Sequence, residues 1–290
     1  MRSAVCVLLY KVRMREALEQ AKAVLLDAGN GNPRRDAELL LLHVTGKPRA
    51  YLLTHSDEPL TPDQFARYRQ LIARRAAHEP LQYLIGEREF YGLRFAVTPD
   101  VLIPRPETEH LVEAALERIP VDQRFEIVDV GTGSGAIAVA LAVARPQARI
   151  TAIDISPAAL EVAKKNAVAH GVGDGVRFSE SDLLEAVGEE TFDMIVSNPP
   201  YIAEVDRETL AAEVRDFEPA GALFAGPSGL EIYERLIPQA AERLRNGGWL
   251  LLEIGAGQEL SLRQLLLGWN NVGFVDDLQG IARVAVAQRP

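Results

Sequence analysis

The chain has 290 residues, of which 48% are hydrophobic and 25% are charged, and its formal net charge is −10. These values are typical of globular proteins, and the length fits one large domain or two, of which we predict two. They exclude disordered, collagen-like and coiled-coil chains. The single cysteine has no partner for an internal disulfide, so neither a cysteine-rich metal site nor an oxidising compartment is indicated, and a cytoplasmic location is expected.

Two global features concern partners. No apolar run approaches the about 20 residues of a membrane-spanning helix, so no membrane partner is expected. Residues 1–94 hold 15 Lys and Arg against 11 Asp and Glu, whereas residues 95–290 hold 16 against 30. An acidic or polyanionic partner would therefore meet the N-terminal part. The alternative is a chance imbalance on solvated helix faces.

Residues 1–13 are predicted to form a loose N-terminal extension. The apolar run 4–10 is barely long enough for the core of a signal peptide. Basic residues follow it and no small-residue cleavage site appears, so a signal peptide is not expected. Met14 is the alternative start of the native chain.

Residues 14–86 have the pattern of a small helical domain. A first helix is expected to end at Gly29, and a second to run from Pro33 to Gly46 as its C-cap. A third follows Thr61, a typical N-cap residue with proline directly after it.

Strands begin after this domain. Residues 87–98 alternate around Tyr91-Gly92, which predicts a β-hairpin linker. Residues 99–290 then alternate strands with helices, which predicts an α/β fold with a doubly wound, mainly parallel sheet. Strands are expected at 125–130, 149–154, 176–181, 192–198, 248–255 and 281–288, and helices at 106–118, 136–145, 157–171 and 229–248.

A glycine-rich loop follows the first strand of this sheet, where ligands of such folds bind. Glycines there let the backbone turn tightly and approach a bulky ligand in front of a helix N-terminus. Asp154 ends the next strand, where a carboxylate can accept hydrogen bonds from both hydroxyls of a ribose. The combination predicts a bound nucleoside, and the alternative for Asp154 is a helix cap. The loop consists of Gly131, Thr132, Gly133, Ser134 and Gly135.

The glycine spacing differs from the Gly-x-Gly-x-x-Gly of dinucleotide-binding folds. With Asp129 before it, the loop resembles the S-adenosylmethionine-binding motif of class I methyltransferases. Asp182 stands where such enzymes often hold the adenine amine, and Leu183 beside it is expected to pack on the ring. The alternative for Asp182 is a cap on the following turn.

The hydrophobic run FDMIV, residues 192–196, is followed by Ser197 and then by Asn198, Pro199, Pro200 and Tyr201. The prolines hold the backbone rigid and leave carbonyls free to accept hydrogen bonds, while Asn198 provides an amide acceptor and Tyr201 a flat face. This set suits a planar substrate with an NH₂ group. Asn198 Oδ1 and the Pro199 carbonyl are expected to orient that group for in-line methyl transfer, because positioning contributes much of the rate.

A third motif, residues 101–109, lies before the sheet. Pro104 and Pro106 stiffen a loop, and Glu107 and Glu109 suit the first turn of a helix. Arg105 either walls the donor pocket or belongs to a rigid linker, and the residues alone leave both alternatives open.

Together these strings resemble the HemK/PrmC family of protein-(glutamine-N5) methyltransferases, which modify peptide chain release factors. The resemblance covers roughly residues 15–290, through IPRPETE, DVGTGSGAIA, AIDISPAALEVAKKNA, SNPPYI and EPAGALFAGPSGLEIY. It implies a class I methyltransferase domain with a seven-stranded sheet at 99–290 and a five-helix-like domain at 14–86 that binds the release factor. S-adenosylmethionine would be the cofactor, and the glutamine of the release factor's Gly-Gly-Gln motif the acceptor.

The same resemblance implies a role for individual residues. Asn198, Pro199, Pro200 and Tyr201 would bind the glutamine, and the cofactor contacts would be Gly131 to Gly135, Asp154, Leu183 and Asn198, with Asp182 added from the motif above. The family pattern is incomplete near the end of the chain, where Gly280 and Arg283 are nevertheless present.

Three other functions compete with this one. An adenine-amine DNA methyltransferase uses the same Asn-Pro-Pro-Tyr chemistry, but it must bind a phosphate backbone, and the acidic residues 95–290 argue against direct nucleic-acid contact. An NAD-dependent oxidoreductase leaves residues 198–201 unexplained, and a non-catalytic binding module has no need of them. The five scattered histidines lack ligand spacing, so no metal site is expected.

Overall fold

The computed structural model describes residues 12–290, and almost all of the expected extension 1–13 lies outside the described residues. The chain forms two compact units, which divide between Ile85 and Gly86. No helix in the described part of the chain is long and apolar enough to cross a membrane.

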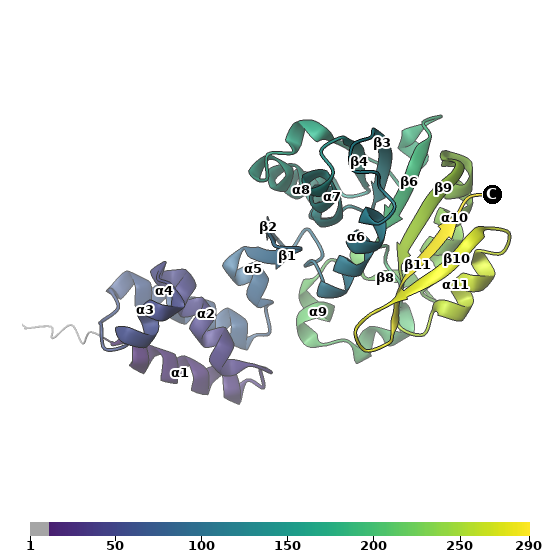
Figure 1. Cartoon of the computed structure of the whole chain (residues 1–290). Coiled ribbons are helices and arrows are strands. Elements are labelled where there is room, and N and C mark those ends of the chain that lie inside the picture. The colour runs from purple at the N-terminus through teal and green to yellow at the C-terminus, as the bar shows by residue number, and fades with distance from the viewer. Residues whose placement is uncertain (1–11) are drawn as a thin grey trace, which may run out of the picture. The chain divides into compact units, whose positions relative to one another are not determined.

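The first unit is helical (Figure 1). Pro33 opens α2 and Gly46 caps it in the left-handed conformation, while the Thr61 side chain accepts a hydrogen bond from the backbone of Gln64 at the start of α4. The buried ring of Tyr68 donates a hydrogen bond of 2.9 Å from its hydroxyl to the Ala37 carbonyl. The helices of this unit are α1 (Met14–Asp27), α2 (Pro33–Thr45), α3 (Arg49–Thr54), α4 (Pro62–Ala76) and α5 (Leu81–Ile85).

The second unit begins with the hairpin of β1 (Glu87–Phe90) and β2 (Leu93–Ala96). Tyr91 and Gly92 both have positive φ, 51° and 72°, as a two-residue turn between twisted strands requires. Phe90 and Phe95 are buried in the core of this unit, so the hairpin is part of the unit's fold. Asn166 of α8 (Pro157–Ala169) holds it by hydrogen bonds to both the N–H and the carbonyl of Ala96.

The main sheet has seven strands in the order β10-β11-β9-β6-β3-β4-β5. Five neighbouring strands run parallel, and β11 pairs antiparallel with both β9 and β10. The predicted doubly wound, mainly parallel, seven-stranded sheet is therefore confirmed. Its strands are β3 (Phe125–Val130), β4 (Ala148–Asp154), β5 (Val176–Glu180), β6 (Phe192–Ser197), β9 (Leu244–Glu253), β10 (Asn270–Asp276) and β11 (Ala282–Gln288).

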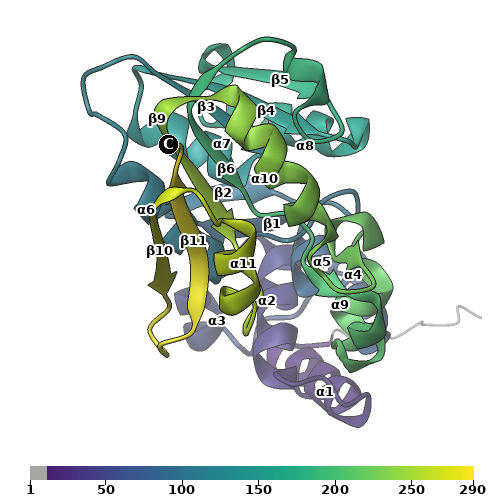
Figure 2. The same cartoon turned by 90° about the vertical axis from the view of Figure 1, so that its right-hand side faces the viewer.

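Helices cover both faces of the sheet, because its strands have apolar side chains on both faces (Figures 1 and 2). In β3, Ile127 packs on the side of α6 (Glu109–Leu116) and α7 (Ala136–Ala144), and Val128 packs on the side of α10 (Glu231–Arg243) and α11 (Glu259–Leu265). Besides short 3₁₀ helices, the unit also contains α9 (Ala212–Phe217) and the strand pair β7 (Ile202–Ala203) and β8 (Phe224–Gly226).

Some boundaries differ from the sequence prediction. The helix expected at 229–248 ends at Arg243, because Leu244 has extended backbone angles and pairs with Phe192 as the start of β9. The helix expected at 106–118 opens as a 3₁₀ turn, Pro106–Thr108, and α6 ends at Leu116. Strand β10 was not predicted, because its sequence lacks a strong apolar pattern. Its residues are exposed or only partly buried, so they need no such pattern.

Candidate active site

The sheet places the predicted motifs at one crevice. From β3 the order continues to β4 and β5 on one side and to β6 and β9 on the other, so the carboxyl ends of β3 and β6 form the switch point of the sheet. A cavity of about 410 Å³ opens there. Its lining comes mainly from the ends of β3, β4, β5 and β6 and from the loop at 100–108, and it also includes residues of the segment 219–222 and of α10.

Asp154 fixes the glycine loop at this cavity. Its Oδ2 accepts a hydrogen bond of 2.8 Å from the backbone N–H of Gly133, and its Oδ1 accepts one of 2.9 Å from the N–H of Ser156. Burial raises the pKa of the Asp154 carboxyl, and these two hydrogen bonds oppose that shift by stabilising the carboxylate. The charge therefore lies at the end of β4, in contact with the loop that follows β3.

Asp129, in β3 directly before the glycine loop, supports that loop by hydrogen bonds. Its Oδ2 accepts hydrogen bonds from the Thr132 hydroxyl at 2.6 Å and from the Ala138 N–H, in the first turn of α7, at 3.2 Å. The side chain is fully buried, and burial raises its pKa to about 7. Asp129 does not line the cavity, so it supports the loop structurally.

The loop residues divide by role. Gly131, Thr132, Gly133 and Ser134 line the cavity, and a Cβ added at Gly133 meets no protein atom within 4 Å. Gly135 does not line it, and the contact of this residue with a cofactor stays a prediction. A Cβ at Gly135 would lie 3.1 Å from the Cβ of Ala163, so this glycine is required for the close approach of α7 and α8.

Asp182 and Leu183 lie at another wall of the cavity. The Asp182 carboxylate forms an ion pair of 2.6 Å with Arg235 of α10, which also lines the cavity. Leu183 has φ of 50°, a strained value for a leucine, and the Ser181 hydroxyl holds this turn by donating to the Leu183 carbonyl at 2.6 Å. Arg235 was not singled out from the sequence, because only the fold brings α10 to this turn.

Asn198, Pro199 and Pro200 line the cavity directly after β6. Asn198 Nδ2 donates a hydrogen bond of 3.1 Å to Thr108 Oγ1, so its Oδ1 is left as the acceptor at the cavity wall. Tyr201 does not line the cavity, and the flat face that it was expected to offer to substrate stays a prediction. Its hydroxyl lies 3.3 Å from Glu253 Oε1, and its ring lies against Gly255.

The motif at 101–109 forms a further wall, and Pro104, Arg105 and Thr108 line the cavity. Arg105 pairs with the buried Glu218 at 2.6 Å, and Glu218 also accepts from the Ile103 N–H at 3.3 Å. Burial raises the pKa of Glu218, and Arg105 opposes that shift. Glu218 begins the sequence segment EPAG, but its partner Arg105 lies 113 residues away, which no local pattern reveals.

The cavity fits a nucleoside with a cationic end. Gly131 and Gly133 have no side chain that would fill it, and Leu102 and Leu183 provide apolar walls. The carboxylates of Asp154 and Asp182 provide negatively charged hydrogen-bond acceptors. Such a wall attracts a sulfonium as well as ribose hydroxyls and an amine.

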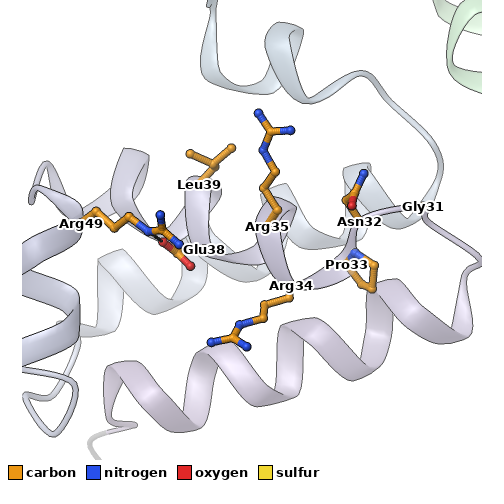
Figure 3. A pocket seen from close by; sticks show the side chains of 8 residues that line it. All are labelled: Gly31, Asn32, Pro33, Arg34, Arg35, Glu38, Leu39 and Arg49. Carbon is orange, nitrogen blue, oxygen red and sulfur yellow. Dashed lines mark hydrogen bonds and ion pairs between the residues drawn. The ribbon is translucent and has the colours of Figure 1, made fainter.

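The first unit has a hollow of its own, of about 450 Å³, beside the start of α2 (Figure 3). Arg49 is paired there with Glu38 at 2.5 Å. Arg34 and Arg35 point in opposite directions, so the guanidinium groups do not converge on one anion.

Known proteins match the chain over most of its length. The family model of the PrmC N-terminal domain matches residues 16–86, and that of the methyltransferase small domain matches residues 108–222. A Koribacter versatilis protein named release factor glutamine methyltransferase is 47% identical over 278 residues, which cover 96% of this chain and 99% of that protein. A Geobacter sulfurreducens protein of the same name is 44% identical, over 93% of this chain and 95% of that protein.

Solved structures share the fold at low sequence identity. The catalytic domain of hMettl16 superposes with a TM-score of 0.55 at 18% identity, covering 78% of this chain and 82% of that one. A 16S rRNA methyltransferase of T. thermophilus, in complex with AdoMet and guanosine, has a TM-score of 0.52 at 24% identity and covers 70% and 50%. These similarities confirm the class I methyltransferase fold.

Proposed function

Because the chain belongs to the release factor glutamine methyltransferase family, we propose that it transfers a methyl group from S-adenosylmethionine to a glutamine side-chain amide nitrogen. The acceptor is the glutamine of the Gly-Gly-Gln motif of a peptide chain release factor. One observation supports this assignment most: the hydrogen bond from Asn198 Nδ2 to Thr108 leaves Asn198 Oδ1 as an acceptor at the cavity wall.

Residues at the ends of β3, β4 and β5 would hold S-adenosylmethionine, which supplies the methyl group when bound. Asp154 has lone pairs beyond those used by Gly133 and Ser156, and these accept hydrogen bonds from ribose hydroxyls. The loop from Gly131 to Ser134 lets the nucleoside approach the backbone. Leu183 packs on the adenine ring, and Asp182 contacts its amine while paired with Arg235.

Residues after β6 would hold the acceptor. Asn198 Oδ1 and the Pro199 carbonyl accept the two N–H groups of the glutamine amide, and the rigid Pro199-Pro200 backbone fixes their spacing. An amide nitrogen is hardly basic, so its orientation toward the donor methyl contributes more than removal of a proton beforehand. Tyr201 does not bind the acceptor in this proposal; its hydroxyl donates a hydrogen bond to Glu253.

The helical domain at 14–86 binds the release factor in this proposal. Residues 1–94 have a positive surplus, and Arg34 and Arg35 are exposed on α2. The acidic residues 95–290 disfavour direct contact with nucleic acid.

Methyl transfer from radiolabelled S-adenosylmethionine tests the proposal. The acceptors are purified release factor, the same factor with its Gly-Gly-Gln glutamine changed to alanine, and duplex DNA. We expect label on the unchanged factor alone, and Asn198→Ala enzyme should leave it unlabelled. Label on DNA alone would favour the DNA methyltransferase, and label on both forms of the factor would place the acceptor at another residue.

A further inference from the structure

A buried carboxyl lies behind the acceptor motif. Glu253 ends β9, which pairs with β6 in parallel so that Leu252 is opposite Ser197, directly before Asn198. Glu253 is 1% exposed, and its Oε2 has no hydrogen-bond partner within the described residues. A buried carboxyl without full hydrogen bonding destabilises a fold, so its presence beside the site calls for a functional reason.

Glu253 is connected to the acceptor motif in two ways. The Tyr201 hydroxyl donates to Glu253 Oε1 at 3.3 Å. The Thr108 hydroxyl also faces the Glu253 carboxyl, and its interaction with this group favours the ionised form. Thr108 Oγ1 in turn accepts from Asn198 Nδ2 at 3.1 Å.

The direction of this chain follows from the hydrogen count. A threonine hydroxyl has a single hydrogen. When that hydrogen is donated to ionised Glu253, Thr108 can only accept from Asn198. The Asn198 amide must then present its nitrogen to Thr108 and its oxygen elsewhere, which is the orientation observed.

We propose that Glu253 and Thr108 are positioning residues for methyl transfer: together they fix the Asn198 amide so that Oδ1 faces the acceptor amide. This inference rests on the proposed function. It also gives the motif at 101–109 a role. Thr108 belongs to that motif, and in this scheme it acts on the acceptor indirectly, by orienting Asn198.

Protonation of Glu253 would reverse the chain. A neutral carboxyl can donate to Thr108, which then donates to Asn198, and the asparagine amide turns its oxygen toward Thr108. Burial raises the pKa of Glu253 to about 7. The titratable or charged groups that face it are Tyr201, Tyr233 of α10, Glu107 of the 3₁₀ turn and Arg283 of β11, which is itself paired with Asp277 at 2.8 Å.

Thr108 variants test the positioning role. Thr108→Val keeps the side-chain shape but has no hydroxyl, and Thr108→Ser keeps the hydroxyl. Steady-state kinetics with release factor should show kcat about 10- to 100-fold lower for Thr108→Val, as expected when a reacting group is misplaced, and near wild type for Thr108→Ser. The Kd of S-adenosylmethionine, measured by calorimetry, should change much less than kcat in both variants.

Glu253→Gln supplies the second readout. In the wild type, kcat should fall as the pH is lowered through about 7, and in Glu253→Gln this fall should disappear at a lower plateau. Asp129 has a similar pKa, so the difference between the two profiles is the relevant quantity. In the double variant Thr108→Val with Glu253→Gln, the loss in kcat should be smaller than the product of the single losses.

The outcomes separate this inference from the function on which it rests. A wild-type enzyme that does not label release factor contradicts the proposed function. An active wild type with Thr108→Val and Thr108→Ser equal in kcat overturns the positioning role, as does a pH profile that Glu253→Gln leaves unchanged. Melting temperatures of all variants identify any that lose activity by unfolding.

Discussion

The carboxylate of Asp154, at the end of β4, accepts a hydrogen bond of 2.8 Å from the backbone N–H of Gly133, in the loop after β3. Two separate sequence motifs are thereby joined into one binding surface, in which the carboxylate holds the loop and faces the cavity. We therefore expect Asp154 to contribute more to cofactor binding than Asp182, whose charge is already paired with Arg235.

Asp154→Asn should weaken cofactor binding. The substitution loses a charge-assisted contact and places an N–H₂ group against Gly133 or Ser156, so the Kd of S-adenosylmethionine is expected to rise about 10- to 100-fold. Asp182→Asn should raise it less. Titration calorimetry of both variants measures the order, and a larger effect at Asp182 would contradict the assignment of the ribose to Asp154.

Asn198→Ala should abolish most turnover while the fold persists. It removes the acceptor at the cavity wall, and loss of one such oriented group typically lowers kcat about 100- to 1000-fold. The matched control is Asn246→Ala, at an exposed position of β9, which should turn over normally. Kinetics with release factor and a circular dichroism melt check the two variants, and normal turnover in Asn198→Ala would refute its role.

Gly133→Ala should mainly weaken cofactor binding, whereas Gly135→Ala should mainly lower stability. Both positions have positive φ, 54° and 81°, which costs an alanine about 1 kcal/mol. At Gly135 the new methyl also meets Ala163 at 3.1 Å, so the free energy of unfolding should fall by about 2 kcal/mol or more. At Gly133 it enters the cavity, and the larger effect should be on cofactor Kd. Urea denaturation and calorimetry separate the two, and equal effects on stability would contradict this division.

Stability should decrease as the pH rises from about 4 to about 7. Burial raises the pKa of Asp129 and of Glu253 to about 7, from ordinary values of 3.8 and 4.5. Between these values the folded protein holds more protons than the unfolded chain, so raising the pH favours unfolding. Asp129→Asn should make the slope of unfolding free energy against pH shallower. An unchanged slope in urea titrations at several pH values would show that Asp129 does not titrate in this range.

A buried ion pair joins two helices of the first unit. Asp36 of α2 and Arg75 of α4 pair at 2.7 Å with both side chains below 10% exposure. Asp36→Ala leaves a buried guanidinium without its carboxylate and should cost about 3 to 5 kcal/mol. Asp57→Ala removes the exposed pair with Arg15 and should cost less than about 1 kcal/mol. Limited proteolysis between residues 12 and 85 of the full chain measures both, and similar cleavage rates would argue against a structural role for the buried pair.

Local sequence patterns predicted most of the fold, because each depends on neighbours in the chain. Pro33 and Gly46 marked the ends of α2, Tyr91-Gly92 the hairpin turn, and apolar runs the parallel strands β3, β4 and β6. The doubly wound sheet followed from the alternation of strands and helices. Strand β10 was missed, since its half-exposed residues have no clear period.

The candidate site was predicted in part for the same reason. The residues directly after β3, β4 and β6 line the cavity because the carboxyl ends of parallel strands meet at one edge of the sheet. The position of Asp154 at a strand end and the rigid segment from Asn198 to Pro200 both followed from the sequence. Their roles in binding remain predictions that the experiments above test.

Only the tertiary structure determined the contacts between distant segments. Packing places Thr108 against Asn198 and Arg105 against Glu218, and it turns Gly135 toward α8 and Tyr201 toward Glu253, away from the cavity. A sequence pattern specifies backbone conformation and the face that a residue occupies over a few turns or strand positions. Which side chains then meet depends on how whole elements pack. For this reason the contacts that support the cavity-lining residues became visible only in the fold.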